Sequence, residues 1–243
     1  DITANVRMET MRKDFVANVS HELRTPLTVI SGYLGTILGD SSKLAPSHVK
    51  PLQQMLQQSQ RMETLLEDLL WLSRIESEQG MELHNPVDIR ALLAELQDEL
   101  AVAYPQRRLE LELATDHKVA GDYRQLYSAV SNLVLNAIKY SAEDSVVKIA
   151  WRQQDGAYHL TVSDQGIGIE AVHIPRLTER FYRVEDSRCS TTGGTGLGLA
   201  IVKHVAASHG ARLQISSKVG KGSAFSLVFP KSGRATAAAQ ISA

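Results

Sequence analysis

Two long stretches repeat their apolar residues at steps of three and four, and this periodicity constrains the fold of the chain more than any other feature. The stretches cover residues 6–38 and 46–77, and Gly39 and Asp40 begin the short break between them. Apolar positions at this spacing form one stripe along an α-helix. Two such helices joined by a short loop form an antiparallel hairpin with too little core to stand alone. We therefore expect two copies of the hairpin to associate as a four-helix bundle.

The second half of the chain mixes predicted helices with predicted strands. Helices are expected at residues 88–102, 122–140 and 197–208. Strands are expected at residues 109–113, 146–152, 158–163, 212–217 and 224–229. Asp88 and Asp122 are suited to cap the first two helices, and Asp155-Gly156 predicts a tight turn between two strands. The predicted fold class is therefore α+β, with an α/β sandwich after the helical hairpin.

Glycine, asparagine and proline mark the boundary between these two parts, at Gly80, Asn85 and Pro86. The expected domain organisation has four parts. Residues 1–78 form a signalling helix and the helical hairpin, 79–87 a linker, 88–231 the sandwich, and 232–243 a disordered tail.

Composition excludes several classes of protein. The formal net charge is −1, so there is no electrostatic case for binding nucleic acid or an anionic membrane. The single cysteine, Cys189, excludes an internal disulfide and fits a reducing compartment. No stretch of about 18 apolar residues occurs. Because the chain also begins at Asp1 rather than Met, we expect the cytoplasmic part of a longer protein.

The first candidate for chemistry is His21, in the helical run FVANVSHELRTPL. An imidazole with an ordinary pKa of about 6.5 is substantially neutral near pH 7, and therefore nucleophilic. Glu22 can accept a proton, Arg24 can meet phosphate charge, and Thr25 lies one helical turn away. Pro26 cannot donate its amide, so the helix is expected to bend there. Most helical histidines have no chemical role, and the other seven in this chain are interpreted in that way.

The second candidate is the run NLVLNAIKYS. Asn132 and Asn136 lie four residues apart and share much of one helical face with Lys139. Two amide oxygens can enter the shell of a Mg²⁺ ion without the repulsion that a carboxylate adds against a triphosphate. A solvated surface position would explain Lys139. It explains the two asparagines poorly, since both interrupt an apolar run.

Two glycine-rich runs, DQGIGI and GGTGLGLA, are suited to nucleotide binding. Asp164 follows a predicted strand, and its carboxylate can accept a hydrogen bond from an adenine amino group. Gly166 and Gly168 let the backbone approach closely, although a plain turn is the alternative. The second run opens a predicted helix whose free amides can bind phosphate, and it matches neither GxxxxGK[ST] nor a Rossmann pattern. Its candidate residues are Gly194, Thr195, Gly196, Leu197 and Gly198.

The order of these sequence runs along the chain resembles the order of motifs in a known protein family. SHELRTP, NLVLNAIKYS, DQGIGI, RFYRVEDSR, GGTGLGLAIVK and GKGSAFSLVFP follow one another as in the catalytic core of the two-component sensor histidine kinases, over residues 10–230. The two glycine runs resemble the Bergerat ATP-binding fold of DNA gyrase and related ATPases. The amino-acid sequence around His21 and in RFYRVEDSR is most similar to that of the phosphate-responsive sensors of the family.

The resemblance implies a role for each candidate residue. His21 corresponds to the phosphoacceptor, Glu22 to its acid–base partner, and Thr25 to the threonine that serves phosphatase activity. Asn136 corresponds to the Mg²⁺ ligand.

The resemblance also implies which residues lie near ATP and which form a lid. Residues 181–195 correspond to the lid, in which Phe181 and Tyr182 are expected to pack and Arg183 to touch phosphate. The positions implied near the nucleotide are Asn132, Asn136, Lys139, Tyr140, Asp164, Gly166, Gly168, Arg183, Gly194, Thr195, Gly196, Leu197 and Gly198.

These readings predict an ATP- and Mg²⁺-dependent protein-histidine autokinase that works as a homodimer. It is expected to pass its phosphoryl group to an aspartate of a response regulator, whose receiver domain docks on the hairpin, and to dephosphorylate that regulator. The expected setting is phosphate-starvation signalling, in the cytoplasmic portion of an inner-membrane sensor whose membrane segments lie upstream. A Bergerat-type ATPase that drives conformational change is the alternative, although it gives SHELRTP no role. A dimeric scaffold that binds ATP only for rigidity is a third possibility.

Overall fold

The computed structural model describes residues 2–40, 44–77, 85–184 and 194–231, which divide into two compact units. Helices α1 (Ile2–Gly39) and α2 (Pro46–Ser77) belong to the first unit, and the other helices and the strands belong to the second. The expected tail and residues 79–84 of the expected linker lie outside the described residues.

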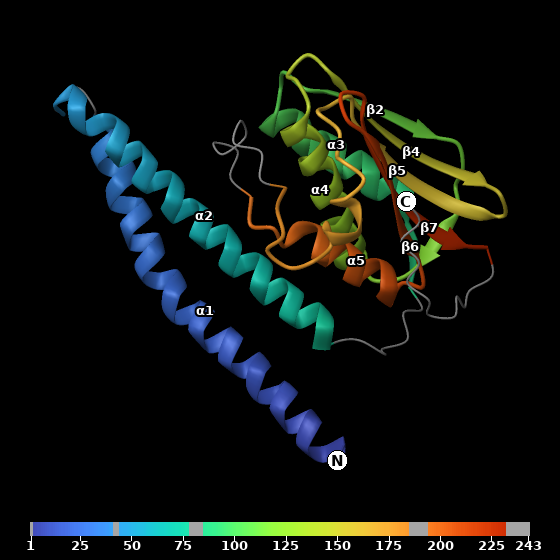
Figure 1. Ribbon diagram of the computed structural model, residues 1–243, viewed down its shortest axis with the longest axis horizontal. Helices are drawn as coiled ribbons and strands as arrows, with labels where there is room; N and C mark the ends of the chain where they lie inside the picture. Colours follow the sequence, from blue (N-terminus) through green and yellow to red (C-terminus); the bar gives the residue numbers. More distant parts are fainter. Residues whose placement is uncertain (1, 41–43, 78–84, 185–193, 232–243) are drawn as a thin grey trace. The chain divides into compact units, whose positions relative to one another are not determined.

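The first unit is the predicted helical hairpin (Figure 1). α1 begins one turn earlier than the periodicity predicts and continues as helix through Pro26, whereas α2 has the predicted bounds. Leu27 and Leu34 of α1 and Leu66 of α2 are buried, as expected of an apolar stripe at helical spacing. Among the described helices, these two included, none combines the length and the hydropathy that a bilayer crossing requires.

A polar contact inside the hairpin aligns its two helices. Ser31 Oγ lies 2.9 Å from Ser59 Oγ and 3.1 Å from Glu63 Oε1, so its one proton is shared between two acceptors. Ser59, which is buried, donates in turn to the carbonyl oxygen of Leu27 at 3.3 Å. A buried hydroxyl costs free energy unless it is hydrogen-bonded. A shift of α1 along α2 would leave this hydroxyl unpaired, so the contact favours one register.

The second unit is a layer of helices on one face of a five-stranded sheet (Figure 1). The helices are α3 (Ile89–Ala103), α4 (Tyr123–Tyr140) and α5 (Gly198–Ser208). The strands, in spatial order, are β2 (Arg108–Leu113), β4 (Val146–Gln154), β5 (Ala157–Ser163), β7 (Gly222–Pro230) and β6 (Arg212–Lys218). The α+β fold class is confirmed, and each of these bounds lies within two residues of its prediction.

The sheets have two features that the sequence analysis did not predict. β2 pairs with β4 in parallel, because the connection between them contains α4 and is long enough for a crossover. β1 (Pro86–Asp88) and β3 (Lys118–Ala120) form a separate antiparallel pair, which the sequence did not predict. Residues 86 and 87 therefore belong to β1 rather than to the expected linker at 79–87. Strands of three residues are too short to show the alternation that identifies a strand.

The core lies between the helices and the sheet. Val147, Ile149 and Trp151 of β4 are fully buried, whereas Lys148 between them is exposed. The alternation over residues 147–149 follows from the two-residue repeat of a strand, although Ala150 is buried as well. The Trp151 ring meets the ring of Phe229 in β7 edge-on, with centroids 6.0 Å apart. One face of the sheet is therefore apolar and carries the helices that position the candidate site.

The predicted capping residues begin α3 and α4. Asp88 Oδ1 accepts hydrogen bonds from the amides of Arg90 and Ala91 at 3.0 and 3.2 Å. Asp122 Oδ1 accepts one from the amide of Gln125 at 2.9 Å. Each carboxylate satisfies amides that have no partner within the helix, and its charge favours the helix N-terminus.

Candidate functional site

The polar residues predicted to share one helical face lie on α4. Asn132, Asn136 and Lys139 are each half-buried, whereas Leu133 next to Asn132 is buried in the core. Asn132 Nδ2 donates to the carbonyl oxygen of Ser128 at 2.9 Å, which orients its amide oxygen away from that turn. The helical repeat thus places two amides and an ammonium at the border of an apolar face, where a ligand can reach them.

Asp164 follows β5 directly, as the sequence predicts. Its Oδ1 accepts a hydrogen bond of 2.7 Å from the amide of Gly166, and its own amide donates to the carbonyl oxygen of Ser223 at 2.9 Å. Burial raises the pKa of the Asp164 carboxyl above its ordinary value, while hydrogen bonds from the Gly166 and Ser223 backbone lower it. A fixed, half-buried acceptor of this kind is suited to the amino group of a ligand.

Gly166 and Gly168 bring their loop so close to its supports that no side chain fits. A Cβ on Gly166 would lie 2.1 Å from the carbonyl oxygen of Tyr140, the last residue of α4. A Cβ on Gly168 would lie 2.1 Å from the carbonyl oxygen of Lys218 in β6, and Gly168 also has a φ of +69°. The amide of Ile167 donates to the Tyr140 carbonyl at 3.2 Å. The loop that carries Asp164 is therefore fixed against the end of α4.

The second glycine run begins α5, as predicted. Leu197, which precedes the helix, gives it no side-chain cap, in contrast to Asp88 and Asp122 before α3 and α4. A Cβ on Gly198 would lie 2.5 Å from Asn132 Oδ1. The N-terminus of α5 therefore adjoins the polar face of α4, and such a terminus is suited to bind an anion.

The structure does not place the whole of this run in the site. Residues 196–198 belong to the second unit, whereas Gly194 and Thr195 cluster with the first. Both directly follow residues 185–193, which lie outside the described residues. The predicted roles of Gly194 and Thr195 stay predictions.

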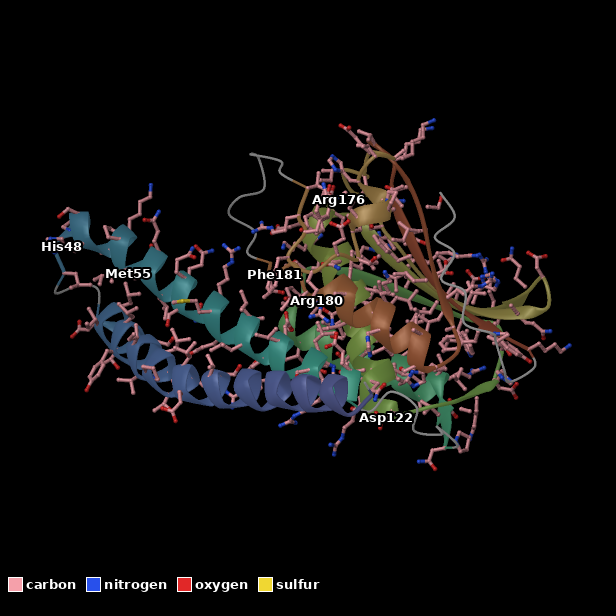
Figure 2. The ribbon with its side chains drawn as sticks, turned by 60° about the horizontal axis from the view of Figure 1, so that its bottom comes forward. His48, Met55, Asp122, Arg176, Arg180 and Phe181 are labelled. Atoms are coloured by element: carbon pink, nitrogen blue, oxygen red, sulfur yellow. The ribbon has the colours of Figure 1, made fainter. Side chains whose placement is uncertain are left out.

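Residues 181–184 are the described start of the predicted lid. Tyr182 packs as expected: its hydroxyl lies 2.7 Å from His173 Nδ1, and the Arg176 guanidinium lies 4.2 Å from its ring centre, at the short helix η2 (Ile174–Arg176). Phe181 differs from expectation, since the residue is 55% exposed (Figure 2 labels Phe181 and Arg176). Arg183 is half-buried, and its contact with phosphate stays a prediction.

Two serines behind the Asp164 loop were not identified from the sequence. Ser217 Oγ accepts a hydrogen bond of 2.8 Å from the amide of Ile169 and donates to the carbonyl oxygen of Gly222 at 3.0 Å. It also lies 2.8 Å from Ser223 Oγ. The turn between β6 and β7 therefore carries the loop. The run GKGSAF contained part of this signal, but nothing in it points to a contact with residues so much earlier in the chain.

Arg107 is a third residue that the sequence did not single out. It lies between α3 and β2, and its guanidinium donates to the carbonyl oxygens of Ile138 at 2.6 Å and Ser141 at 3.2 Å, and also to that of Ala142. These carbonyls belong to the C-terminal end of α4, where they lack helical partners and where a cation is favoured. Arg107 therefore holds the end of α4 on which the Asp164 loop rests.

The phosphoacceptor candidates lie on α1, in the first unit. The side chain of His21 lies outside the described residues, those of Glu22 and Thr25 are exposed, and that of Arg24 is half-buried. α1 remains helical at Pro26, which has no amide to donate to the carbonyl of Glu22. The chemical roles of these residues stay predictions.

The arrangement in the second unit fits an adenine nucleotide. Asp164 offers an acceptor for an amino group, its glycine loop is fixed against α4 and β6, and the start of α5 offers amides for phosphate. Asn136 and Asn132 offer amide oxygens of the kind that bind a largely hydrated Mg²⁺ ion.

Two family models match the chain, one in each unit. Residues 11–78 match the His Kinase A (phospho-acceptor) domain. Residues 121–233 match the family described as histidine kinase-, DNA gyrase B-, and HSP90-like ATPase. The first range contains α2 and most of α1, and the second contains α4, the Asp164 loop and α5.

Individual proteins match over both units. The phosphate regulon sensor protein PhoR of Pseudomonas aeruginosa is 50% identical over 231 residues, which cover 94% of this chain and 52% of that protein. The chain spans about half the length of the curated relatives it matches. A solved mycobacterial sensor histidine kinase, MprB, is 32% identical, with a TM-score of 0.54 over 60% of this chain and 97% of its own. Full-length ShkA in complex with AMPPNP is 25% identical, with a TM-score of 0.65 over 92% of this chain and 47% of its own.

Proposed function

The chain belongs to the family of sensor histidine kinases, and we propose on this premise that it is an ATP-dependent protein-histidine autokinase. In the proposed reaction, the unprotonated ring nitrogen of His21 attacks the γ-phosphorus of ATP. A phosphorus–nitrogen bond forms, the bond from the γ-phosphorus to the bridging oxygen breaks, and ADP leaves. Glu22 accepts the proton that the imidazole releases.

In the second unit, each part of the site has a proposed contact with ATP. Asp164 accepts a hydrogen bond from the amino group of adenine, and the close packing of Gly166 and Gly168 on α4 and β6 holds the loop that carries it. The amides of residues 196–198 bind phosphate oxygens at the start of α5. Lys139 and Arg183 add positive charge on the side of the triphosphate.

We assign the Mg²⁺ ion to Asn136, with Asn132 beside it on the same face of α4. The ion would neutralise charge on the triphosphate when bound. Mg²⁺ keeps most of its water and takes few protein ligands, so one or two amide oxygens suit it. Asn132 also adjoins Gly198, which puts the ion next to the amides that would bind phosphate.

The hairpin is proposed to carry both the dimer interface and the docking surface for a response regulator. Leu23, Ile30, Tyr33 and Met62 expose large apolar side chains along it, and Tyr33 is 69% exposed. Exposed apolar surface of this extent favours association, and a second hairpin would complete a four-helix bundle. The receiver domain then takes the phosphoryl group from His21 onto an aspartate.

The proposed setting is phosphate-starvation signalling. PhoR of Pseudomonas aeruginosa is named for the phosphate regulon, and half of its aligned residues are identical to those of this chain. The relatives are about twice as long as the chain, so a sensory part would lie outside it. We propose the chain as the cytoplasmic portion of an inner-membrane sensor.

One observation carries the proposal: a single chain joins a helical hairpin that matches a phospho-acceptor domain to a unit that matches an ATPase. A Bergerat-type ATPase that drives conformational change would need only the second unit. It would give no role to the histidine of the hairpin.

Incubation of the 243-residue chain with ATP labelled at the γ-phosphate separates the alternatives. An autokinase becomes labelled, an ATPase releases labelled phosphate without becoming labelled, and a scaffold does neither. Asn136→Ala should lose both Mg-ATP binding and label while light scattering still reports a dimer. The exposed Asn85 supplies the control, since Asn85→Ala should keep the label. Full affinity of Asn136→Ala for Mg-ATP would contradict the assignment of the ion.

A further inference from the structure

The N-terminal half of α4 lies beside α5, and contacts join the two helices at both ends of α5. At one end, Gly198 at the start of α5 lies against Asn132 of α4. At the other end, His209, which follows α5, bonds to Asp122, which caps α4 (Asp122 is labelled in Figure 2). The stretches of α4 and α5 between the two contacts have nearly the same length. A shift at the His209 end would therefore move α5 relative to Asn132.

Both ring nitrogens of His209 are hydrogen-bonded. Nε2 accepts a hydrogen bond of 3.0 Å from the backbone amide of Asp122. Nδ1 lies 2.8 Å from the carbonyl oxygen of Val205 and 3.1 Å from Ser208 Oγ. An amide can only donate, so Nε2 must be unprotonated, and the ring proton on Nδ1 then bonds to Val205. The contact therefore requires a neutral imidazole in one tautomer.

Gly121 lets the backbone before α4 pack directly against the His209 ring. A Cβ on Gly121 would lie 2.3 Å from His209 Cδ2. Beside the ring, Ser208 Oγ donates to Oε1 of Gln125, which is buried, at 3.2 Å. A proton on Nε2 would point at the N–H of Asp122 and leave that amide without its acceptor. Because a half-buried donor that loses its acceptor costs free energy, protonation favours separation of the two helix ends.

The surroundings of His209 keep it neutral. Burial lowers the pKa of the imidazole, against the opposing effects of the bond to Val205 and of the charge and amide of Asp122. Charged residues on the neighbouring elements, Lys118 on β3, Arg124 on α4 and Arg212 on β6, are exposed to solvent. A histidine with a lowered pKa binds its proton more readily when its contact is broken. The contact is therefore complete above the ordinary pKa of about 6.5 and weakens as the pH falls towards the lowered value.

We propose that His209 is a positioning residue for the nucleotide site: its neutral imidazole holds α4 and α5 in register, and its protonation loosens the site and lowers the affinity for ATP. The inference rests on the proposed function, because the site that it regulates is the proposed ATP site. His209 acts through Asp122 and the length of α4, rather than by touching the nucleotide.

Two substitutions in the full chain separate the hydrogen bond to Asp122 from the titration of the imidazole. His209→Gln places an amide oxygen near the position of Nε2 and cannot titrate, whereas His209→Asn is too short to reach Asp122. Calorimetry with Mg-ATP at pH 8 and pH 5 compares them with wild type. At pH 8 we expect His209→Gln to bind ATP as wild type does, and His209→Asn to bind about fivefold more weakly, as expected when one buried hydrogen bond is lost in part. On acidification, His209→Gln should lose less affinity than wild type.

The phosphates of ATP titrate in the same pH range and change the affinity of every variant. The test is therefore the difference in pH dependence between wild type and the variants. Identical pH profiles for wild type and His209→Gln would overturn the proposal. So would a His209→Asn variant that binds ATP as wild type does but melts at a lower temperature, since His209 would then only stabilise the fold. A wild-type chain that binds ATP with the predicted pH profile but never labels itself would contradict the proposed kinase function and support this inference.

Discussion

Nη2 of Arg107 donates a hydrogen bond of 2.6 Å to the carbonyl oxygen of Ile138, the residue before Lys139 in the last turn of α4. The same guanidinium bonds to Ser141 and so holds the end of the helix against which Gly166 packs. Arg107→Ala removes this cation. We predict a loss of about 1–3 kcal/mol in the free energy of unfolding, since bonds to charged groups contribute this much, and weaker ATP binding. Urea unfolding and calorimetry measure the two effects.

The next residue in the chain supplies the control for Arg107. Arg108 has a side chain that is 69% exposed, and it lies 3.6 Å from Glu110 in a surface ion pair. Exposed pairs contribute little, so Arg108→Ala should change the free energy of unfolding by no more than about 0.5 kcal/mol. Equal effects of the two substitutions would show that the bonds from Arg107 to α4 do not stabilise it.

Asp164→Asn should separate stability from binding. Burial raises the pKa of the Asp164 carboxyl in the folded chain, so its contribution to stability is present below the unfolded pKa and is lost as the pH rises through the folded pKa. The ionised carboxylate is therefore less favourable in the folded chain than in the unfolded chain. We predict that Asp164→Asn melts at the same temperature as wild type or higher, yet binds ATP at least tenfold more weakly, on the scale of a lost hydrogen bond to a charged group.

Asp144 offers a matched control, because it is exposed in the turn after α4. Asp144→Asn should leave both the melting temperature and the ATP affinity unchanged. A lower melting temperature for Asp164→Asn, with ATP affinity intact, would indicate that Asp164 is a structural residue of the loop.

Two glycines with the same backbone conformation test the close packing of the Asp164 loop. Gly168 and Gly156 have φ of +69° and +74°, but only around Gly156 is there open space for a Cβ. Gly156→Ala should cost about 1 kcal/mol and leave ATP binding intact. Gly168→Ala meets the Lys218 carbonyl as well, so it should cost more and abolish ATP binding. Equal stabilities and equal affinities would contradict the packing described for the loop.

Most elements of the fold could be predicted, because their signals are local. The stripe of α2, the cap at Asp122 and the turn at Asp155-Gly156, where both residues have positive φ, need only a few neighbouring residues. β1 and β3 were missed because three residues are too few for a pattern. The parallel pairing of β2 was missed because it depends on which distant strand lies beside it.

The candidate site divides in the same way. Asn132, Asp164 and Gly198 could be proposed from the sequence because each stands in a run whose composition is unusual for its element, and their roles stay predictions. Arg107 and His209 could not be identified, because they bond to backbone groups at distant positions in the chain. No local sequence pattern indicates such bonds. His209 was interpreted as a histidine without chemistry. Its bonds agree with that reading, and only its place between α4 and α5 gives it a further role.

Thr25 tests whether the chain has two activities. It is exposed on α1, four residues after His21, so both positions lie on the same helical face. If its hydroxyl holds a water in line with the phosphoryl group on a docked regulator, Thr25→Ala should label itself and transfer the label normally. It should dephosphorylate the regulator at least tenfold more slowly, as expected for the loss of a group that positions a nucleophile. If both activities fall together, or neither changes, Thr25 only shapes the helix before Pro26.

The central claim is that the chain phosphorylates itself at His21, and the most direct measurement is the label on His21→Gln. Wild type and His21→Gln are incubated with ATP labelled at the γ-phosphate, and calorimetry confirms that both bind ATP. We predict that wild type becomes labelled, that acid removes the label as expected of a phosphorus–nitrogen bond, and that His21→Gln binds ATP equally but accepts no label. Label that persists on His21→Gln would contradict the account.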